Sequence, residues 1–161
     1  MLKKPILKYS VVIPIYNEEK NVSILDKELK QVMKTLGSYE IVYINDGSSD
    51  KSLEELKKLK KAVVINMNRN YGQSTSLDVG FRYAKGEIII SMDGDLQNDP
   101  HDIPRLLKKL NESDLDVVTG WRRNRKDSSG IKILTRTGRL LRRIVIKDSV
   151  HDTGCTLRVY K

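Results

Sequence analysis

Two aspartates, Asp93 and Asp95, stand one residue apart at the end of the apolar run Glu87–Met92, which is typical of a buried strand. Where a strand ends, such a pair can face the same side, and Gly94 between them lets the backbone approach a ligand closely. Carboxylate oxygens suit hard cations such as Mg²⁺ or Mn²⁺, which share their other positions with substrate phosphates. The pair predicts a divalent-cation site, with Gln97 as a further oxygen ligand. The alternative is a loop in which an aspartate only caps the next helix.

A third carboxylate, Asp46, closes another apolar run, Glu40–Asn45. At that place it can accept hydrogen bonds from a nucleotide base or a ribose. The residues that follow it, Ser48–Asp50, are better explained as a turn and a helix cap. Further along, Arg69 offers a guanidinium for a phosphate, and Gly72 offers a place where the backbone can pass close to it. Taken alone, the glycine-containing loop Arg69–Gln73 is weak evidence for a phosphate site.

These residues have to be positioned by strands that alternate with helices. The predicted strands are apolar runs without strict alternation, as in a parallel sheet covered on both faces: Tyr9–Ile15, Glu40–Asn45, Ala62–Met67, Glu87–Met92 and Leu115–Thr119. Helical spacing of apolar residues predicts helices over 22–36, 53–59 and 103–110, with a less clear one over 74–84, and Gly37 as a stop for the first. This alternation predicts an α/β domain of the Rossmann type, in which ligands bind at the carboxyl ends of the strands.

Length and composition favour one globular domain over residues 1–161, with 39% hydrophobic and 32% charged residues. The one cysteine, Cys155, cannot form an internal disulfide, which fits a reducing compartment. The first residues lack the apolar run of a signal peptide, and nothing approaches the about 18 apolar residues of a membrane helix. We therefore expect a cytoplasmic chain.

The net charge of +9 is confined to one segment, 122–147, which holds ten Lys and Arg against one acid, while 20 basic and 20 acidic residues remain elsewhere. Within it, residues 131–147 predict a helix with a basic stripe and an apolar side, of the kind that lies on anionic membranes. The alternative is a helix that packs its apolar side on the domain and leaves the basic face in water. Nucleic acid is not an expected partner, because Trp121 is the single aromatic residue beside this segment.

Five motifs in order closely resemble those of the polyprenyl-phosphate glycosyltransferases, which are family 2 enzymes with the GT-A fold. They cover nearly the whole chain and are Val11–Glu19, Val42–Asp50, Arg69–Gln73, Met92–Pro100 and His151–Cys155. Each motif is moderately specific, and the ordered set is highly specific. The resemblance implies a mostly parallel central sheet flanked by helices, and an inverting, metal-dependent transfer of sugar from a UDP- or GDP-linked donor to a dolichyl or undecaprenyl phosphate.

The resemblance also implies roles for single residues. Asp95, Asp152 and Arg122 would be catalytic, Arg122 by neutralising phosphate charge and Asp152 by lining the acceptor side. Asp93, Asp95 and Gln97 would bind Mg²⁺ or Mn²⁺. The nucleotide sugar would be bound by Pro14, Tyr16, Asn17, Glu18, Asp46, Arg69, Gly72, Gln73 and Asp93. The same resemblance places the protein at the cytoplasmic face of a membrane, where segment 131–147 would contact anionic lipid.

Two departures and two alternatives accompany this interpretation. Gly94 stands where many relatives have alanine, and many relatives continue beyond Lys161, so we expect a chain truncated at its carboxyl end. A family 2 enzyme with a soluble sugar or polysaccharide acceptor is one alternative, and a nucleotide-sugar-binding module without catalysis is the other. A phosphate acceptor is already anionic, its second pKa being about 6. We therefore expect no strong general base, with Asp152 positioning the acceptor. The sugar, the base, the lipid and the oligomeric state are left open.

Overall fold

The structure, a computed structural model, describes residues 7–113, 115–121 and 154–161. The basic segment 122–147, with Arg122 and the membrane-facing stretch 131–147 inside it, lies outside these residues, and so does Asp152. Their predicted roles stay predictions.

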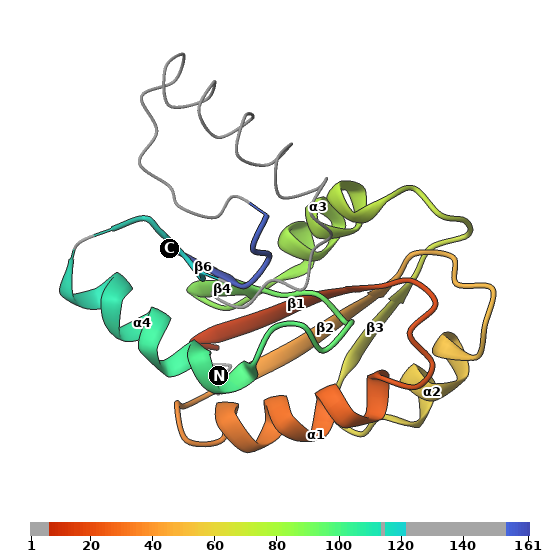
Figure 1. Cartoon of the computed structure of the whole chain (residues 1–161), viewed down its shortest axis with the longest axis horizontal. Helices are drawn as coiled ribbons and strands as arrows, with labels where there is room; N and C mark the ends of the chain where they lie inside the picture. Colours follow the sequence, from red (N-terminus) through yellow and green to blue (C-terminus); the bar gives the residue numbers. More distant parts are fainter. Residues whose placement is uncertain (1–6, 114, 122–153) are drawn as a thin grey trace, which may run out of the picture.

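Six strands form one twisted, mostly parallel sheet (Figure 1). Along the sheet the order is β3-β2-β1-β4-β6-β5. The strands are β1 Tyr9–Ile15, β2 Tyr39–Asn45, β3 Val63–Asn66, β4 Ile88–Ser91, β5 Val117–Thr119 and β6 Arg158–Tyr160. The first four pair in parallel, whereas β6 lies antiparallel between β4 and β5. All four parallel strands therefore end at the same edge of the sheet, where the sequence predicted a site.

Helices cover both faces of this sheet (Figure 1). They are α1 Val22–Met33, α2 Ser52–Lys58, α3 Gln73–Tyr83, α4 Ile103–Glu112 and a short 3-10 helix, η1 Pro100–Asp102. The larger core joins the side chains of Val11, Ile13 and Ile15 to α1, α2 and α4. The smaller one joins Val12, Val42 and Ile44 to apolar residues of α3. Successive residues of β1 thus point to opposite cores, and this explains why residues 11–15 are all apolar.

Gly80 allows α3 to lie close to the sheet. A Cβ atom at this position would be 2.3 Å from Val12 Cγ1 and 2.7 Å from Ile44 Cδ1. Both neighbouring side chains are fully buried. Close packing of α3 therefore depends on a residue without a side chain at this point.

The predicted α/β fold is confirmed, with differences at the ends of elements. Helix α1 ends at Met33. This is three residues before the end of the predicted range, 22–36, and four residues before the expected stop at Gly37. Strand β6 was not predicted, because three residues carry no periodic signal and its pairing is decided by two strands far away in sequence. The less clear helix is present as α3 and begins one residue earlier, at Gln73.

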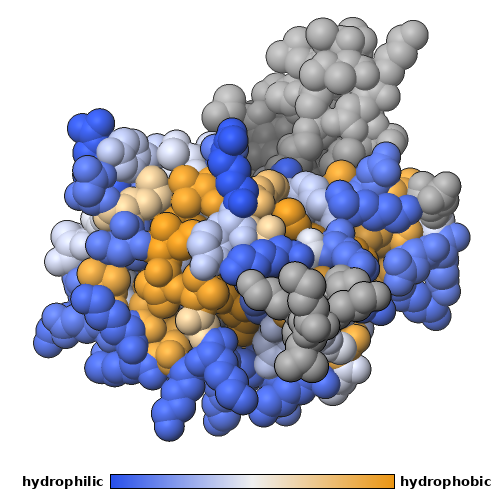
Figure 2. Space-filling view, turned by 180° about the vertical axis from the view of Figure 1, so that it is seen from behind, coloured by the Kyte–Doolittle hydropathy of each residue, from blue (hydrophilic) through white to orange (hydrophobic). Residues whose placement is uncertain are grey.

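Seen from behind, the molecule shows a continuous hydrophobic area over its middle, bordered by hydrophilic residues (Figure 2). Within the part of the chain that the structure describes, no helix is long and apolar enough to cross a membrane.

Candidate active site

A cleft of about 230 Å³ opens at the carboxyl ends of β1, β2 and β4. Its walls come from loops that follow these strands and from the start of α3. The lining residues are Pro14, Tyr16, Glu18, Asp46, Asn70, Gly72, Gln73, Asp93, Gly94 and Asp95. Eight of these belong to the set predicted for the donor and the metal, so residues up to 81 positions apart in sequence meet at one place.

The loop after β4 brings both predicted metal carboxylates to the cleft. Asp93 Oδ1 accepts a hydrogen bond from the side-chain amide of Gln73, the first residue of α3. Asp95 Oδ1 accepts one from the backbone N–H of Gln97, at 3.0 Å. Directly after Asp95, Leu96 has a φ of +61°. This conformation is costly for a bulky side chain, and packing against the larger core helps to maintain it. The chain therefore turns sharply after Asp95 and is held in that turn.

Gly94 occupies a space with no room for a side chain unless a neighbour moves. A Cβ atom there would be 2.4 Å from Ile15 Cδ1 and 3.6 Å from Glu18 Cγ. The sequence predicted that the backbone at Gly94 approaches a ligand closely. In the structure it lies close to the side chain of Ile15, at the end of β1. Because the crowded atom is the tip of a side chain, alanine at position 94 would require a shift of Ile15.

The loops after β1 and β2 are joined by hydrogen bonds from the backbone of one to side chains of the other. The N–H of Asn17 donates to Ser48 Oγ (3.1 Å), that of Glu18 to Ser52 Oγ (2.7 Å) and that of Glu19 to Asp50 Oδ2 (3.1 Å). Asn17 itself has a φ of +57°, and its side-chain oxygen accepts from the N–H of Ser49 (2.9 Å). The structure therefore adds a second role to Ser48–Asp50, which the sequence explained as a turn and cap.

The cap assigned to Asp50 is found only in part. Its Oδ1 accepts from the N–H of Ser52, at 2.9 Å, while the residue at the cap position itself, Lys51, makes no side-chain cap bond. Partial burial acts to raise the pKa of Asp50, but hydrogen bonds from Ser52 and Glu19 outweigh it and hold that pKa below its ordinary value. Asp50 is thus kept as an acceptor for both loops.

Glu18 is an acidic residue of the cleft whose pKa is raised above its ordinary value. Desolvation raises its pKa, a hydrogen bond from the side chain of Asn21 opposes that rise, and the negative charges of Asp95, Asp50 and Asp93 add to it. The cleft therefore concentrates negative charge, which favours a bound cation.

Asp46 is buried, with 2% of its surface exposed. Its Oδ1 accepts from the N–H of Tyr71 (2.8 Å) and its Oδ2 from the N–H of Gly72 (2.9 Å). Close to it, Gly47 has a φ of +63°, and a Cβ atom there would be 2.3 Å from the backbone carbon of Arg69. The loops after β2 and β3 are thus in direct backbone contact, which only glycine at position 47 permits.

Three predicted residues do not line the cleft. Asn17 supports the neighbouring loop, Gln97 is exposed and meets Asp95 through its backbone, and Arg69 stacks its guanidinium on the ring of Tyr71, 4.8 Å from the ring centre. Their assignment to donor or metal stays a prediction. Two residues of the site were not among those predicted. Asn70 lines the cleft, and Ser52 accepts a hydrogen bond from the N–H of Glu18. Asn70 lies inside the recognised motif, but Ser52 carried no signal beyond its place near a helix start.

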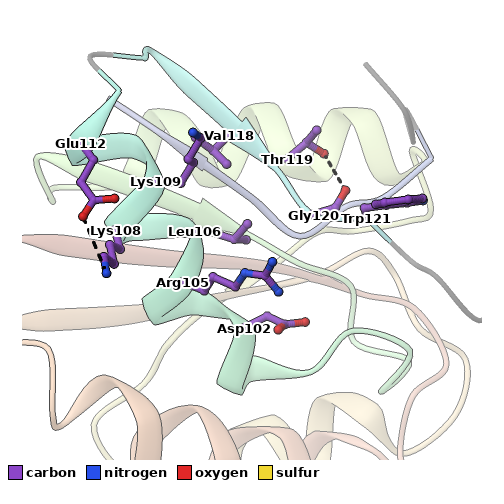
Figure 3. A pocket seen from close by; sticks show the side chains of 10 residues that line it. All are labelled: Asp102, Arg105, Leu106, Lys108, Lys109, Glu112, Val118, Thr119, Gly120 and Trp121. Atoms are coloured by element: carbon purple, nitrogen blue, oxygen red, sulfur yellow. Dashed lines mark hydrogen bonds and ion pairs between the residues drawn. The ribbon is translucent and has the colours of Figure 1, made fainter. Parts of the chain in front are cut away.

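A larger hollow of about 600 Å³ lies between α4 and β5 (Figure 3). Its lining mixes apolar and charged residues: Asp102, Arg105, Leu106, Lys108, Lys109, Glu112, Val118, Thr119, Gly120 and Trp121. Lys108 pairs with Glu112 at 3.7 Å along the exposed side of α4. Neither Asp93 nor Asp95 lines this hollow, so the smaller cleft is the better candidate for the metal and the donor.

The chain resembles known proteins over nearly its whole length. The family model described as Glycosyl transferase family 2 matches residues 10–161. A curated relative, the undecaprenyl-phosphate 4-deoxy-4-formamido-L-arabinose transferase of Klebsiella pneumoniae, is 42% identical over 98% of this chain. The match covers 50% of that protein, so the chain spans about half the length of this relative.

Solved structures share the fold. Glucosyl-3-phosphoglycerate synthase from Mycobacterium tuberculosis, solved with UDP, matches with a TM-score of 0.77 and 18% identity, over 96% of this chain and 57% of that one. A mannosyltransferase from Pyrobaculum calidifontis, solved with GDP-Man and Mn²⁺, matches with a TM-score of 0.61 and 20% identity, over 72% of this chain and 36% of that one.

Proposed function

Because the chain belongs to glycosyl transferase family 2, we propose that it transfers a sugar from a nucleoside-diphosphate sugar to a polyprenyl phosphate, with the help of a divalent cation. The observation that carries this proposal is the cleft at the carboxyl ends of the parallel strands, where Asp93 and Asp95 meet donor-side residues of three other segments. The lipid acceptor is supported by the Klebsiella relative, whose name states an undecaprenyl-phosphate acceptor.

The residues of the cleft fit Mg²⁺ or Mn²⁺. Two carboxylates, Asp93 and Asp95, line the cleft. Desolvation is the main reason why the pKa of Glu18 is raised, and a hydrogen bond from Asn21 opposes the rise. The negative charges of Asp95, Asp50 and Asp93 raise this pKa further. Over residues 7–113, 115–121 and 154–161, no group of three or more His, Cys, Asp or Glu side chains could hold a metal ion by itself. Two carboxylates completed by diphosphate oxygens and water are the usual arrangement for Mg²⁺. When bound, the cation would stabilise charge on the departing diphosphate.

The protein side chains would bind and orient the donor. Pro14 and Tyr16 border the cleft beside Asp46 and would frame the base and ribose, while Gln73 holds Asp93 by one oxygen. A phosphate oxygen of the lipid would attack the sugar C1 as the nucleoside diphosphate departs, which inverts the configuration at that carbon. Because this oxygen already carries negative charge near neutral pH, the reaction needs no strong general base. Asp152 and Arg122 would act on the acceptor side.

A transfer assay tests the proposal. The chain is incubated with radiolabelled UDP- and GDP-sugars, undecaprenyl phosphate in detergent micelles, and Mn²⁺ or EDTA. We expect label to enter the organic phase with at least one donor, only with the metal. Transfer to soluble sugars in place of the lipid would favour the soluble-acceptor alternative. Donor binding without transfer or hydrolysis would favour a binding module, and either result would overturn the proposal.

Contact with an anionic membrane is the second part of the proposal and rests on segment 131–147. Each basic residue near an anionic surface contributes about 1 kcal/mol. We expect the chain to co-sediment with liposomes that contain phosphatidylglycerol, and to be released as salt is raised. Equal binding to vesicles of neutral lipid, or no binding, would contradict the electrostatic attraction.

A further inference from the structure

The start of α3 lacks the local groups that usually stabilise a helix amino terminus. Its cap residue, Gly72, has no side chain, no side-chain cap bond is formed, and the first turn contains no acidic residue. The N–H of Gly72 and its neighbour Tyr71 are instead bound by a carboxylate from 25 residues earlier, that of Asp46, at 2.9 and 2.8 Å. A negative charge at this place also complements the dipole of the helix.

The carboxylate is itself firmly held. The N–H of Asp46 donates to Ile15 O at 2.8 Å, and the carbonyl of the preceding Asn45 accepts from the N–H of Met67 at 2.9 Å. The position therefore lies between the ends of β1 and β3, and the side chain is almost fully buried. Both oxygens are directed at backbone N–H groups of the protein.

The helix start that Asp46 holds continues directly into the candidate metal site. Gly72 has a φ of +91°, and the carbonyl of this residue accepts from Thr75 and Ser76 to begin α3. The next residue, Gln73, donates its amide to Asp93 Oδ1. A shift of the backbone at 71–72 would thus move the amide away from the carboxylate.

We propose that Asp46 is a positioning residue, which holds the start of α3 so that Gln73 fixes the orientation of Asp93. This inference rests on the proposed function, because it takes Asp93 to be a cation ligand. It adds a role to the sequence-based expectation that Asp46 binds the base, since each carboxylate oxygen that accepts one N–H keeps a second lone pair.

Two measurements test the inference on the whole chain. The first is amide hydrogen exchange at Tyr71 and Gly72, followed by NMR without metal. Asp46→Asn replaces one acceptor oxygen by an NH₂ group that faces an N–H donor, so we expect exchange at one or both amides to become at least about tenfold faster. Asp78→Asn, the same substitution at an exposed carboxylate of α3 that pairs with Arg82, is the matched control and should change neither amide.

The second measurement is titration with Mn²⁺ alone, followed by electron paramagnetic resonance. Loss of a group that orients a metal ligand typically weakens affinity 10- to 100-fold. We expect at least about tenfold for Asp46→Asn and for Gln73→Ala, and no further loss in the double variant, because the two act through one contact. Gly72→Ala supplies an independent variant if Asp46→Asn does not fold. A methyl group there meets no atom within 4 Å, but it strains the positive φ, so Mn²⁺ should again bind more weakly.

Each other outcome overturns the inference. Unchanged exchange at both amides would show that Asp46 does not hold the loop. Unchanged Mn²⁺ affinity, or effects of Asp46→Asn and Gln73→Ala that multiply in the double variant, would show that the loop does not act on Asp93. Weaker binding of UDP or GDP without metal, at unchanged amide exchange, would show that Asp46 acts on the nucleotide and not on the loop. Absence of Mn²⁺ binding in the wild-type chain would remove Asp93 as a cation ligand and would be recognised as a failure of the proposed function itself.

Discussion

Asp93 and Asp95 are close in sequence but are held by different partners. A side chain, that of Gln73, fixes the first, and a backbone N–H, that of Gln97, fixes the second. Their orientation thus depends on α3 for one carboxylate and on the turn at Leu96 for the other. Because different partners hold the two carboxylates, each can be perturbed and tested separately.

Replacement of either carboxylate by its amide is expected to abolish most metal-dependent transfer. Asp95→Asn keeps size and one oxygen but removes the charge, and loss of one such stabilising group usually lowers kcat about 10²- to 10³-fold. Transfer assays at saturating donor measure this, with Asp78→Asn as a control of matching chemistry. Activity within a factor of about two of the wild type would remove Asp95 from the catalytic set.

Glu18 is expected to lower stability at neutral pH. Its pKa is raised in the folded state above the ordinary value of 4.5, chiefly by desolvation. The folded chain therefore binds more protons than the unfolded chain just above that pH, and stability falls as pH rises through this window. Glu18→Gln should unfold at a higher temperature than the wild type at pH 7 and at an equal one at pH 4, in EDTA. A variant that is less stable at pH 7 would contradict the sign.

Among the helices, α3 serves both the core and the cleft. Gly80 brings it onto Val12 and Ile44, and Gln73 at its other end reaches Asp93. Gly80→Ala improves helix propensity by about 1 kcal/mol, but the methyl group would overlap two buried side chains, and overpacking of this kind costs about 1–3 kcal/mol. We expect a net loss of about 1 kcal/mol or more in urea unfolding, whereas exposed Ser74→Ala should stay within about 0.5 kcal/mol. A stabilised Gly80→Ala variant would show that the core can yield.

The sequence predicted most elements because their signals are local. Strand β1 was placed with its observed bounds, and the parallel direction of the first four strands followed from the alternation of strands and helices. Residues at strand ends were also identified as site residues, because the carboxyl ends of parallel strands meet at one edge of the sheet. The hydrogen-bond partners of these residues were not predicted. Whether Asp46 meets a ligand or the N–H of Gly72 depends on the path of a loop 25 residues away, and Arg69 turned to Tyr71 for the same reason.

Taken as one body, the domain divides its charge unevenly. Acidic residues gather at the cleft, while the excess of Lys and Arg lies in segment 122–147. A donor diphosphate would therefore approach a negative cleft and needs a cation to be bound well. This predicts that nucleotide and metal bind together more tightly than either does alone.

A thermal-shift panel checks this expectation. A ligand at 100 times its Kd stabilises the folded state by about 2.7 kcal/mol, which for a domain of this size corresponds to about 5–10 °C in Tm. We expect a shift of this size for UDP or GDP with Mn²⁺, and a much smaller one for the nucleotide in EDTA. Equal shifts with and without metal would contradict the coupling.

The position of β6 constrains the order in which the chain can acquire its structure during synthesis. The parallel strands β1 to β4 can associate as soon as residues up to Ser91 have left the ribosome. Strand β5 has to wait, because its neighbour in the sheet is formed by Arg158–Tyr160, and Lys161 then closes the edge by a bond to Asp116 O. The candidate cleft is thus built from segments translated early, whereas the far edge of the sheet and the hollow beside α4 are completed later.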